Sequence, residues 1–285
     1  MSVSATILCE NTVFGIDGAL AEHGWSAWLE TPAGPFLFDT GSGRTLLNNA
    51  LLFNVPLHQA RGILLSHHHN DHTGGLLEAV QIIRRGSGAA EVPVYGHPDL
   101  FKQSFYERKG TRSYSALPLT RGALETAGAR FDLSPAWREI APGVALTGEV
   151  PRRTGFEPGD QTLKHYDDAG NVIVDPIRDD QTVVIDTPDG LFVVLGCSHA
   201  GLINILTYIA EQTGTARFHT VMGGTHLGLV EEAQAEATIA ALRDFDIGRL
   251  GAAHCTGPRV AGRLAQAFGD RFFHCSVGLT IPVHA

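Results

Sequence analysis

Four metal-ligating side chains occur within six consecutive residues of this sequence. His67, His69, Asp71 and His72 form the pattern H-x-H-x-D-H. Imidazole nitrogens and carboxylate oxygens are common ligands of divalent zinc, iron and manganese, and metal binding is the usual reason for such histidine-rich tracts. The spacing therefore predicts a metal site. We interpret His68, inside the run but outside the pattern, as a packed or exposed histidine.

The pattern lies between an expected strand and an expected helix. Gly62–Leu65 is apolar and typical of a buried strand. The apolar spacing over residues 76–83 predicts a helix, with Thr73 as its N-cap. A tight turn between these elements would direct the first two histidines of the pattern one way, and its aspartate and last histidine another. One turn could then serve two adjacent metal ions.

Three later histidines, His199, His226 and His254, each follow an apolar, strand-like segment within a few residues. Because α/β proteins gather their chemistry at the edge where strands end, we expect these histidines to converge on the H-x-H-x-D-H turn. The other histidines lack such a context, and we interpret them as ordinary: His23, His58, His97, His165, His219, His274 and His284.

The composition is that of a globular chain. The 285 residues carry a formal net charge of −9, and 44% of them are hydrophobic. This balance excludes a disordered acidic chain, and no basic stripe suggests a nucleic-acid partner. Apolar runs such as Leu191–Leu195 are far shorter than the ~20 residues of a membrane helix. Four scattered cysteines are too few for a disulfide scaffold, and no signal peptide is evident. We expect a cytoplasmic protein.

The pattern of apolar segments predicts one α/β domain over residues 1–285. Strands dominate the first third and the middle, and strands alternate with helices from Leu191 onward. This mixture suggests two sheets packed face to face, with helices on their outer faces. The expected strands include Ser4–Leu8, Ser26–Glu30, Phe36–Phe38, Val144–Thr147, Thr182–Asp186, Leu191–Leu195, Thr220–Met222 and Phe272–His274.

Two polar segments, at about 103–120 and 150–180, are expected to be long loops, which in a compact domain are usually lids or binding loops. Both carry basic residues: Lys109, Arg112, Arg152 and Arg153. Such side chains could bind a phosphate or carboxylate of a substrate, although solvated loop charges are the plainer interpretation.

The H-x-H-x-D-H pattern after a strand resembles the signature of the metallo-β-lactamase superfamily. Phe36–Gly41, which reads F-L-F-D-T-G, resembles its first motif, in which an aspartate, here Asp39, supports the metal loop. The resemblance covers nearly the whole chain. It implies an αββα four-layer sandwich of two mixed β-sheets flanked by helices, with the site at one edge between the sheets.

Three further segments are similar to a subgroup of that superfamily. They are G-C-S-H-A-G at 196–201, G-G-T-H-L at 223–227 and H-C-T-G at 254–257. The subgroup surrounds the archaeal 7,8-dihydropterin-6-methyl-4-(β-D-ribofuranosyl)aminobenzene 5′-phosphate synthase. Its name implies a phosphorylated substrate and pterin chemistry.

The sequence departs from the superfamily pattern in two places. A bridging aspartate usually follows a strand-ending glycine, but here Cys197 follows, with His199 two residues on. The usual histidine of the third motif is also missing, because the corresponding region contains Glu149 and no histidine. We favour His199 as the replacement ligand, with Cys197 or Glu149 as alternatives. A softer or incomplete ligand set would favour a single ion, or iron or manganese instead of zinc.

We expect two ligand sets: His67, His69 and His199 for one ion, and Asp71, His72 and His254 for the other. Asp71 would also orient the attacking hydroxide. His226 resembles the histidine that phosphodiester-processing members hold near the leaving group, so we expect it to be a proton donor, with metal ligation as its second interpretation.

These assignments predict a metal-dependent hydrolase that binds one or two divalent ions, zinc being the favoured metal and iron or manganese the alternatives. Its substrate would be a small anionic or phosphorylated ester, which the resemblance to the subgroup implies is pterin-related. Arg152 and Arg153 would contact its anionic group. Two alternatives stay open: a mononuclear iron oxygenase of sulfur species, and a module that retains a metal ion but serves in ligand binding or regulation.

Overall fold

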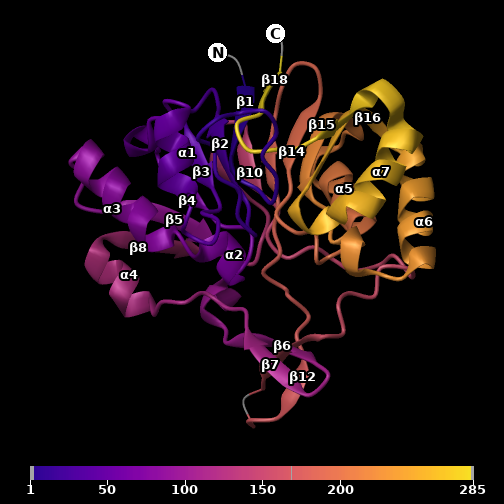
Figure 1. The fold of residues 1–285 in the computed structure, drawn as a ribbon, viewed down its shortest axis with the longest axis horizontal. Coiled ribbons are helices and arrows are strands. Elements are labelled where there is room, and N and C mark those ends of the chain that lie inside the picture. Colours follow the sequence, from indigo (N-terminus) through magenta and orange to yellow (C-terminus); the bar gives the residue numbers. More distant parts are fainter. Residues whose placement is uncertain (1–2, 168, 284–285) are drawn as a thin grey trace.

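The chain folds into two seven-stranded sheets packed face to face, as seen in a computed structural model that describes residues 3–167 and 169–283 (Figure 1). The first sheet has the order β18-β1-β2-β3-β4-β5-β8. Its strands are β1 (Val3–Cys9), β2 (Ser26–Glu30), β3 (Phe36–Phe38), β4 (Ile63–Leu64), β5 (Val92–Gly96), β8 (Ala129–Leu133) and β18 (Thr280–Val283). Because β3, β4, β5 and β8 are parallel and the others antiparallel, the sheet is mixed.

The second sheet has the order β17-β16-β15-β14-β13-β10-β9 and is also mixed. Its strands are β9 (Arg138–Ala141), β10 (Val144–Leu146), β13 (Val183–Ile185), β14 (Leu191–Val194), β15 (Arg217–Gly224), β16 (Asp246–Ala253) and β17 (Phe272–His274). The parallel strands β14, β15 and β16 end on the same side of the sheet. The loops that follow them are therefore neighbours, as the sequence pattern predicts.

Helices cover the outer face of each sheet (Figure 1). The helices beside the first sheet are α1 (Leu46–Leu52), α2 (Asn70–Thr73), α3 (Leu76–Ser87) and α4 (Arg121–Ala127), and those beside the second are α5 (Leu202–Thr213), α6 (Glu232–Ala241) and α7 (Gly257–Phe268). Three buried apolar clusters match this layering. One lies between the two sheets, and the other two lie between a sheet and its helices. The αββα four-layer sandwich is thereby confirmed.

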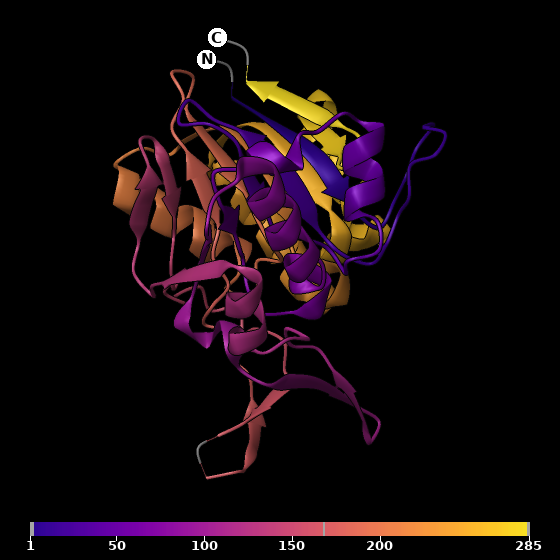
Figure 2. The ribbon, with the colours of Figure 1, turned by 90° about the vertical axis from the view of Figure 1, so that its left-hand side faces the viewer.

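The two segments expected to be loops instead pair with each other. They contribute β6 (Ser104–Arg108), β7 (Thr111–Tyr114), β11 (Leu163–Tyr166) and β12 (Val172–Val174) to a third sheet of order β12-β11-β6-β7. We call this four-stranded sheet the arm sheet; it projects from one end of the sandwich (Figure 2). The expectation of loops was wrong for these residues because the strands are short and partly exposed, so they lack the sustained apolar alternation that marks a half-buried strand.

None of the helices in the described ranges is both long enough and apolar enough to cross a lipid bilayer.

Candidate metal centre

The H-x-H-x-D-H turn joins β4 to the short helix α2, and helix α3 begins only at Leu76. Thr73 is therefore not the N-cap of α3, as predicted, because it is the last residue of α2. Its hydroxyl donates back to the His69 carbonyl at 2.9 Å. The segment that follows β7 also holds the turn, since the backbone of His69 pairs with that of Ala116 and the Asn70 amide donates to the Ser115 carbonyl at 2.8 Å.

Asp39, directly after β3, is fully buried beneath this turn. Its carboxylate accepts the Ser66 amide and the Ser66 hydroxyl, each at 2.7 Å, and lies 2.7 Å from His72 Nδ1. Burial alone would lower the pKa of His72, but the charge and hydrogen bond of Asp39 outweigh it and raise that pKa. The contact fixes the ring, so that its other nitrogen, Nε2, faces the centre. Carboxylates commonly orient metal-ligating histidines in this way.

Three histidines converge as the sequence predicts. One ring nitrogen from each of His67, His69 and His199 lies within 4.8 Å of the others. The rings of His67 and His69 both lie 4.9 Å, between centroids, from the ring of His199. All three side chains are buried, and burial, aided by the neighbouring histidines, lowers the pKa of each. Neutral imidazole is the form that binds metal ions.

Several buried nitrogens of this group bond to nothing else. His69 Nε2 and both ring nitrogens of His199 have no hydrogen-bond partner among the described residues. An unsatisfied buried polar atom costs ~1–3 kcal/mol, so each such atom in a native structure calls for an explanation, such as an ion that it binds. These three neutral imidazoles, several of whose buried nitrogens have no hydrogen-bond partner among the described residues, therefore fit a borderline divalent cation such as zinc.

The second expected set is assembled only in part. Asp71 Oδ2 lies 3.2 Å from His254 Nε2. His72 does not join them; its Nε2 lies 3.1 Å from Cys197 Sγ, although its ring is 5.1 Å from that of His254. The second histidine beside Asp71 is instead His23, whose Nε2 lies 3.1 Å from Asp71 Oδ2. Burial would raise the pKa of Asp71, but the bonds to both histidines lower it, so the side chain is a carboxylate.

His23 was interpreted as an ordinary histidine, yet it belongs to one of the possible metal-binding groups, with Asp71 and His254. No local signal marks it, because the loop after β1 carries it to the centre. The same loop supplies Glu10 and Asn11, which orient His254. The His254 amide donates to Glu10 at 2.6 Å, and its Nδ1 lies 2.8 Å from the Asn11 side-chain oxygen.

His226 lies beside the first group, with its ring centroid 4.3 Å from that of His199. Its Nε2 is 3.5 Å from Asp160 Oδ2, a carboxylate that sequence reasoning missed. Burial opposes protonation of His226, but its hydrogen bonds to Asp160 and Cys255, as acceptors, outweigh burial and raise its pKa to about 10. The other ring nitrogen, Nδ1, is buried and has no partner within the described part of the chain.

The two alternative ligands differ sharply in position. Cys197 belongs to three of the five possible metal-binding groups found among the described residues. Glu149 belongs to none of those groups; its carboxylate is largely exposed and faces Arg178, with 3.8 Å between oxygen and nitrogen. The structure therefore offers no support for Glu149 as a ligand.

The four residues around this centre that follow strands share an unusual backbone. Asp39, Ser198, His226 and His254 have φ values of 54°, 62°, 54° and 48°. The left-handed region is disfavoured for residues with a Cβ. Such conformations cluster at functional sites, where the surrounding structure holds them in place. At each of these four positions, this conformation turns the backbone sharply just after the strand ends.

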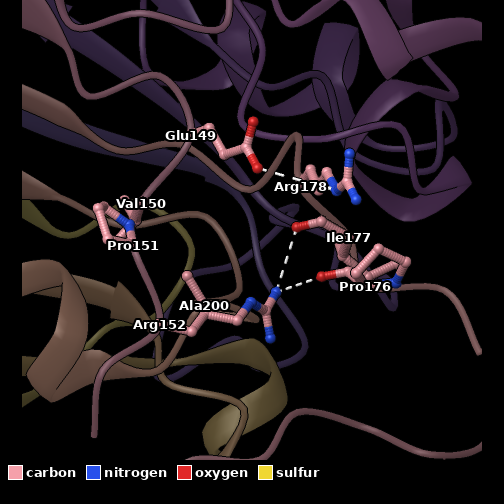
Figure 3. A pocket seen from close by; sticks show the side chains of 8 residues that line it. All are labelled: Glu149, Val150, Pro151, Arg152, Pro176, Ile177, Arg178 and Ala200. Atoms are coloured by element: carbon pink, nitrogen blue, oxygen red, sulfur yellow. Dashed lines mark hydrogen bonds and ion pairs between the residues drawn. The ribbon is translucent and has the colours of Figure 1, made fainter.

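The predicted substrate-binding arginines point in different directions. Arg152 lines a cavity of about 470 Å³ beside Ala200, the residue after His199 (Figure 3). Its guanidinium donates to the backbone carbonyls of Pro176 and Ile177. Arg153 instead pairs with Glu211 on the outer surface, at 2.7 Å. Arg153 is therefore not a cavity residue, and the first role of Arg152 is to tie two loops together.

The arm sheet contributes Tyr106 to the centre, a residue that sequence reasoning missed. Its ring centroid lies 6.0 Å from that of His69. Burial, together with the negative charge of Asp71, raises the pKa of the phenol, so it stays a neutral donor. The basic residues of this sheet lie elsewhere. Lys109 is in the turn between β6 and β7, and Arg112 donates to Tyr166 at 3.0 Å.

His68 faces away from the centre, in line with the sequence interpretation of it as a packed side chain. It is fully buried; its Nδ1 lies 2.8 Å from Asp179 and its Nε2 lies 2.7 Å from Ser104. Asp179 also accepts the His68 amide at 2.7 Å. Lys102 stands 3.9 Å from the same carboxylate. This network fixes the middle of the turn from behind.

The Asp179 network should make stability depend on pH. Burial would raise the pKa of Asp179, but the charges of His68 and Lys102 lower it. Its ionised form therefore stabilises the fold above the unfolded pKa of ~3.9, and that stabilisation is lost as the pH falls below this value. We expect Asp179→Asn to cost ~1.5–3 kcal/mol at neutral pH, and the difference from wild type to shrink below pH ~4.

Urea unfolding at a series of pH values measures this difference. Asp99→Asn is the matched control, because Asp99 also faces Lys102, at 3.6 Å, but is more exposed. A deficit of the Asp179 variant that is the same at every pH would contradict the assignment.

Of the other histidines interpreted as ordinary, His284 lies outside the described residues. His58, His97, His165, His219 and His274 belong to none of the possible metal-binding groups in the described ranges.

Comparison with known proteins agrees with this architecture. Residues 21–203 match the Metallo-beta-lactamase superfamily. The chain is 29% identical over 269 residues to the 7,8-dihydropterin-6-methyl-4-(beta-D-ribofuranosyl)-aminobenzene-5'-phosphate synthase of Methanocaldococcus jannaschii, covering 92% of this chain and 90% of that protein. It is 27% identical to an uncharacterized protein of the same organism, with coverage of 97% and 99%.

Among solved structures, the chain resembles Tm1679, described as a metal-dependent hydrolase of the beta-lactamase superfamily. The TM-score is 0.83 at 26% identity, covering 99% of this chain and all of that one.

Proposed function

Because the chain belongs to the metallo-β-lactamase superfamily, we propose that it is a metal-dependent hydrolase of a small anionic ester. Most members of the superfamily are hydrolytic enzymes, and the archaeal relative is named as a synthase, so the chain is an enzyme of this superfamily. The observation that carries the proposal is the convergence of His67, His69 and His199, whose buried nitrogens are in part unshared.

We infer that His67, His69 and His199 hold one divalent ion, of which zinc best matches the donor type, and that Asp71 and His254 face a second position. A bound divalent ion lowers the pKa of water from ~16 to near ~7, and so supplies a nucleophile at neutral pH. Asp71 is a carboxylate that can accept a hydrogen bond from this water and orient it.

His226 is placed to protonate the leaving group. Asp160 and Cys255 keep its ring doubly protonated. Because Asp160 faces Nε2, the proton available for transfer is the one on Nδ1. The Tyr106 phenol can donate to the substrate from the side of the arm sheet. These groups together supply orientation and general acid catalysis.

The substrate class is a finer proposal. The name of the archaeal relative points to a phosphorylated, pterin-related compound. The cavity at Arg152 and Ala200 can accommodate a small molecule. We also propose a cytoplasmic location and no nucleic-acid partner, supported by four free cysteines and the net charge of −9.

Metal analysis together with a substrate screen tests the function. Purified protein should contain a divalent metal ion and turn over a phosphodiester such as bis(4-nitrophenyl) phosphate, or a lactone or thioester. Persistent inactivity with metal bound would favour a binding or regulatory module instead. Iron content with a visible absorption band would favour the oxygenase alternative.

Replacing the proposed proton donor should slow turnover without removing metal. We expect His226→Gln to lower kcat ~10²-fold or more, the typical contribution of general acid catalysis, and Asp160→Asn to lower it by a smaller factor. Steady-state kinetics with bis(4-nitrophenyl) phosphate, run beside metal analysis, provide the measurement. His274→Gln is the control because His274 is exposed on β17. Loss of metal together with activity would instead indicate that His226 is a ligand.

A further inference from the structure

Two cysteines meet at the metal centre. Cys197 lies three residues beyond the end of β14, and Cys255 lies in the turn between β16 and α7. Both are free thiols. Their Sγ atoms and one ring nitrogen of His254 all lie within 4.8 Å of one another. Cys255 Sγ also lies 3.6 Å from the Cys197 carbonyl and accepts the His226 amide at 3.2 Å.

The backbone between the cysteines is packed closely enough to fix this arrangement. Gly224, at the end of β15, separates the two turns. A Cβ at this position would lie 2.5 Å from the Gly196 carbonyl and 2.7 Å from Cys255 Sγ. Because contacts under 3.0 Å essentially never occur for real Cβ atoms, a side chain at 224 would push the cysteine-bearing turns apart.

Cys197 is also shared by several of the possible metal-binding groups. Its Sγ belongs to one group with His67 and His72, and to another with His199 and His226. The thiol is buried and lies where the superfamily pattern leads one to expect a bridging aspartate. A carboxylate oxygen is a hard ligand, whereas a cysteine thiolate is a soft one.

We propose that Cys197, Cys255 and His254 form a thiolate-rich second cation site, with Cys255 as a ligand outside both of the ligand sets expected from the sequence. Two thiolates and one imidazole supply three ligands of a tetrahedral shell, and Asp71, 3.2 Å from His254 Nε2, faces the same position. Such a donor set favours zinc or iron(II) and disfavours manganese and magnesium, which prefer oxygen ligands. The proposal deepens the proposed function, because it specifies which metal ions the centre selects.

Cobalt(II) titration tests the site without reference to activity. Cobalt bound by thiolates gives an intense sulfur-to-metal charge-transfer absorption in the near ultraviolet. We expect this band in the wild-type protein, and we expect Cys255→Ser to reduce its intensity by about half because one of two thiolate ligands is lost. Cys275→Ser is the matched control, since Cys275 is buried but lies outside every possible metal-binding group among the described residues.

X-ray absorption on zinc-loaded wild-type protein gives an answer that does not depend on how a variant folds. A shell of Zn–S distances at ~2.3 Å, beside Zn–N distances at ~2.0–2.1 Å, supports the proposal. Stoichiometric metal binding with no sulfur shell overturns it and leaves the hydrolase proposal intact. Absence of any bound metal overturns both. A cobalt band that persists unchanged in Cys255→Ser, while Cys197→Ser abolishes it, removes Cys255 from the site.

Discussion

His67→Ala should lose at least one bound metal ion per chain and more than ~10⁴-fold of the hydrolytic rate, because enzymes exceed the uncatalysed reaction by ~10⁶-fold or more. His67 belongs to two possible metal-binding groups, one with His69 and His199 and one with His72 and Cys197. Its removal leaves both groups one ligand short. Metal analysis and turnover of bis(4-nitrophenyl) phosphate are measured on the same preparation.

The control for this variant is His58→Ala, because His58 is exposed and belongs to no candidate group in the described ranges. The control should retain full metal content and rate. If His67→Ala kept its metal and its rate, the assignment of this centre as the hydrolytic site would be wrong.

Asp39→Ala should be the most destabilising of the substitutions considered, at a cost of ~3–5 kcal/mol in the free energy of unfolding, the range for removing one partner of a buried charged pair. The carboxylate accepts two hydrogen bonds from Ser66 and contacts the buried His72 ring. All three groups would lose the Asp39 carboxylate as a partner. Urea unfolding of metal-free protein measures the effect without any contribution from bound ions.

Asp186→Ala provides the comparison, since Asp186 also directly follows a strand, β13, but is exposed. Surface substitutions of this kind usually change stability by less than ~0.5 kcal/mol. Equal stability losses in the two variants would contradict a supporting role for Asp39. Asp39→Asn should lie between them, because an amide keeps one oxygen acceptor.

The strands of the sandwich could be predicted where they are buried, because buried strands have a recognisable apolar sequence pattern. Ser26–Glu30, Phe36–Phe38 and Phe272–His274 were predicted with the bounds that the structure gives. In the second sheet, β14 is buried along its whole length and is a continuous apolar run, as expected for a strand covered on both faces. The arm sheet could not be predicted in this way. Its strands pair residues far apart in the sequence, such as Tyr106 with Leu163, and little of their surface is apolar core.

The residues of the metal centre that directly follow strands could be predicted from the sequence. His199 and His254 follow strands and do reach the turn. His23 and Asp160 could not be found, because each lies in an irregular loop whose path depends on tertiary contacts. His23 comes from the loop after β1, and Asp160 from the segment between Val150 and β11. Arg153 shows the opposite error, a charge that the sequence places near Arg152 but that the chain turns toward solvent.

The left-handed backbones of Asp39, Ser198, His226 and His254 have a cost of ~1–2 kcal/mol each relative to glycine, which accepts this conformation freely. At Asp39 the buried hydrogen bonds offset this cost, whereas selection for thermal tolerance alone would favour glycine at His226 and His254. A library of variants selected only for heat resistance should become enriched in glycine at positions 226 and 254. The most heat-resistant variants should also be the ones that bind a metal ion most weakly.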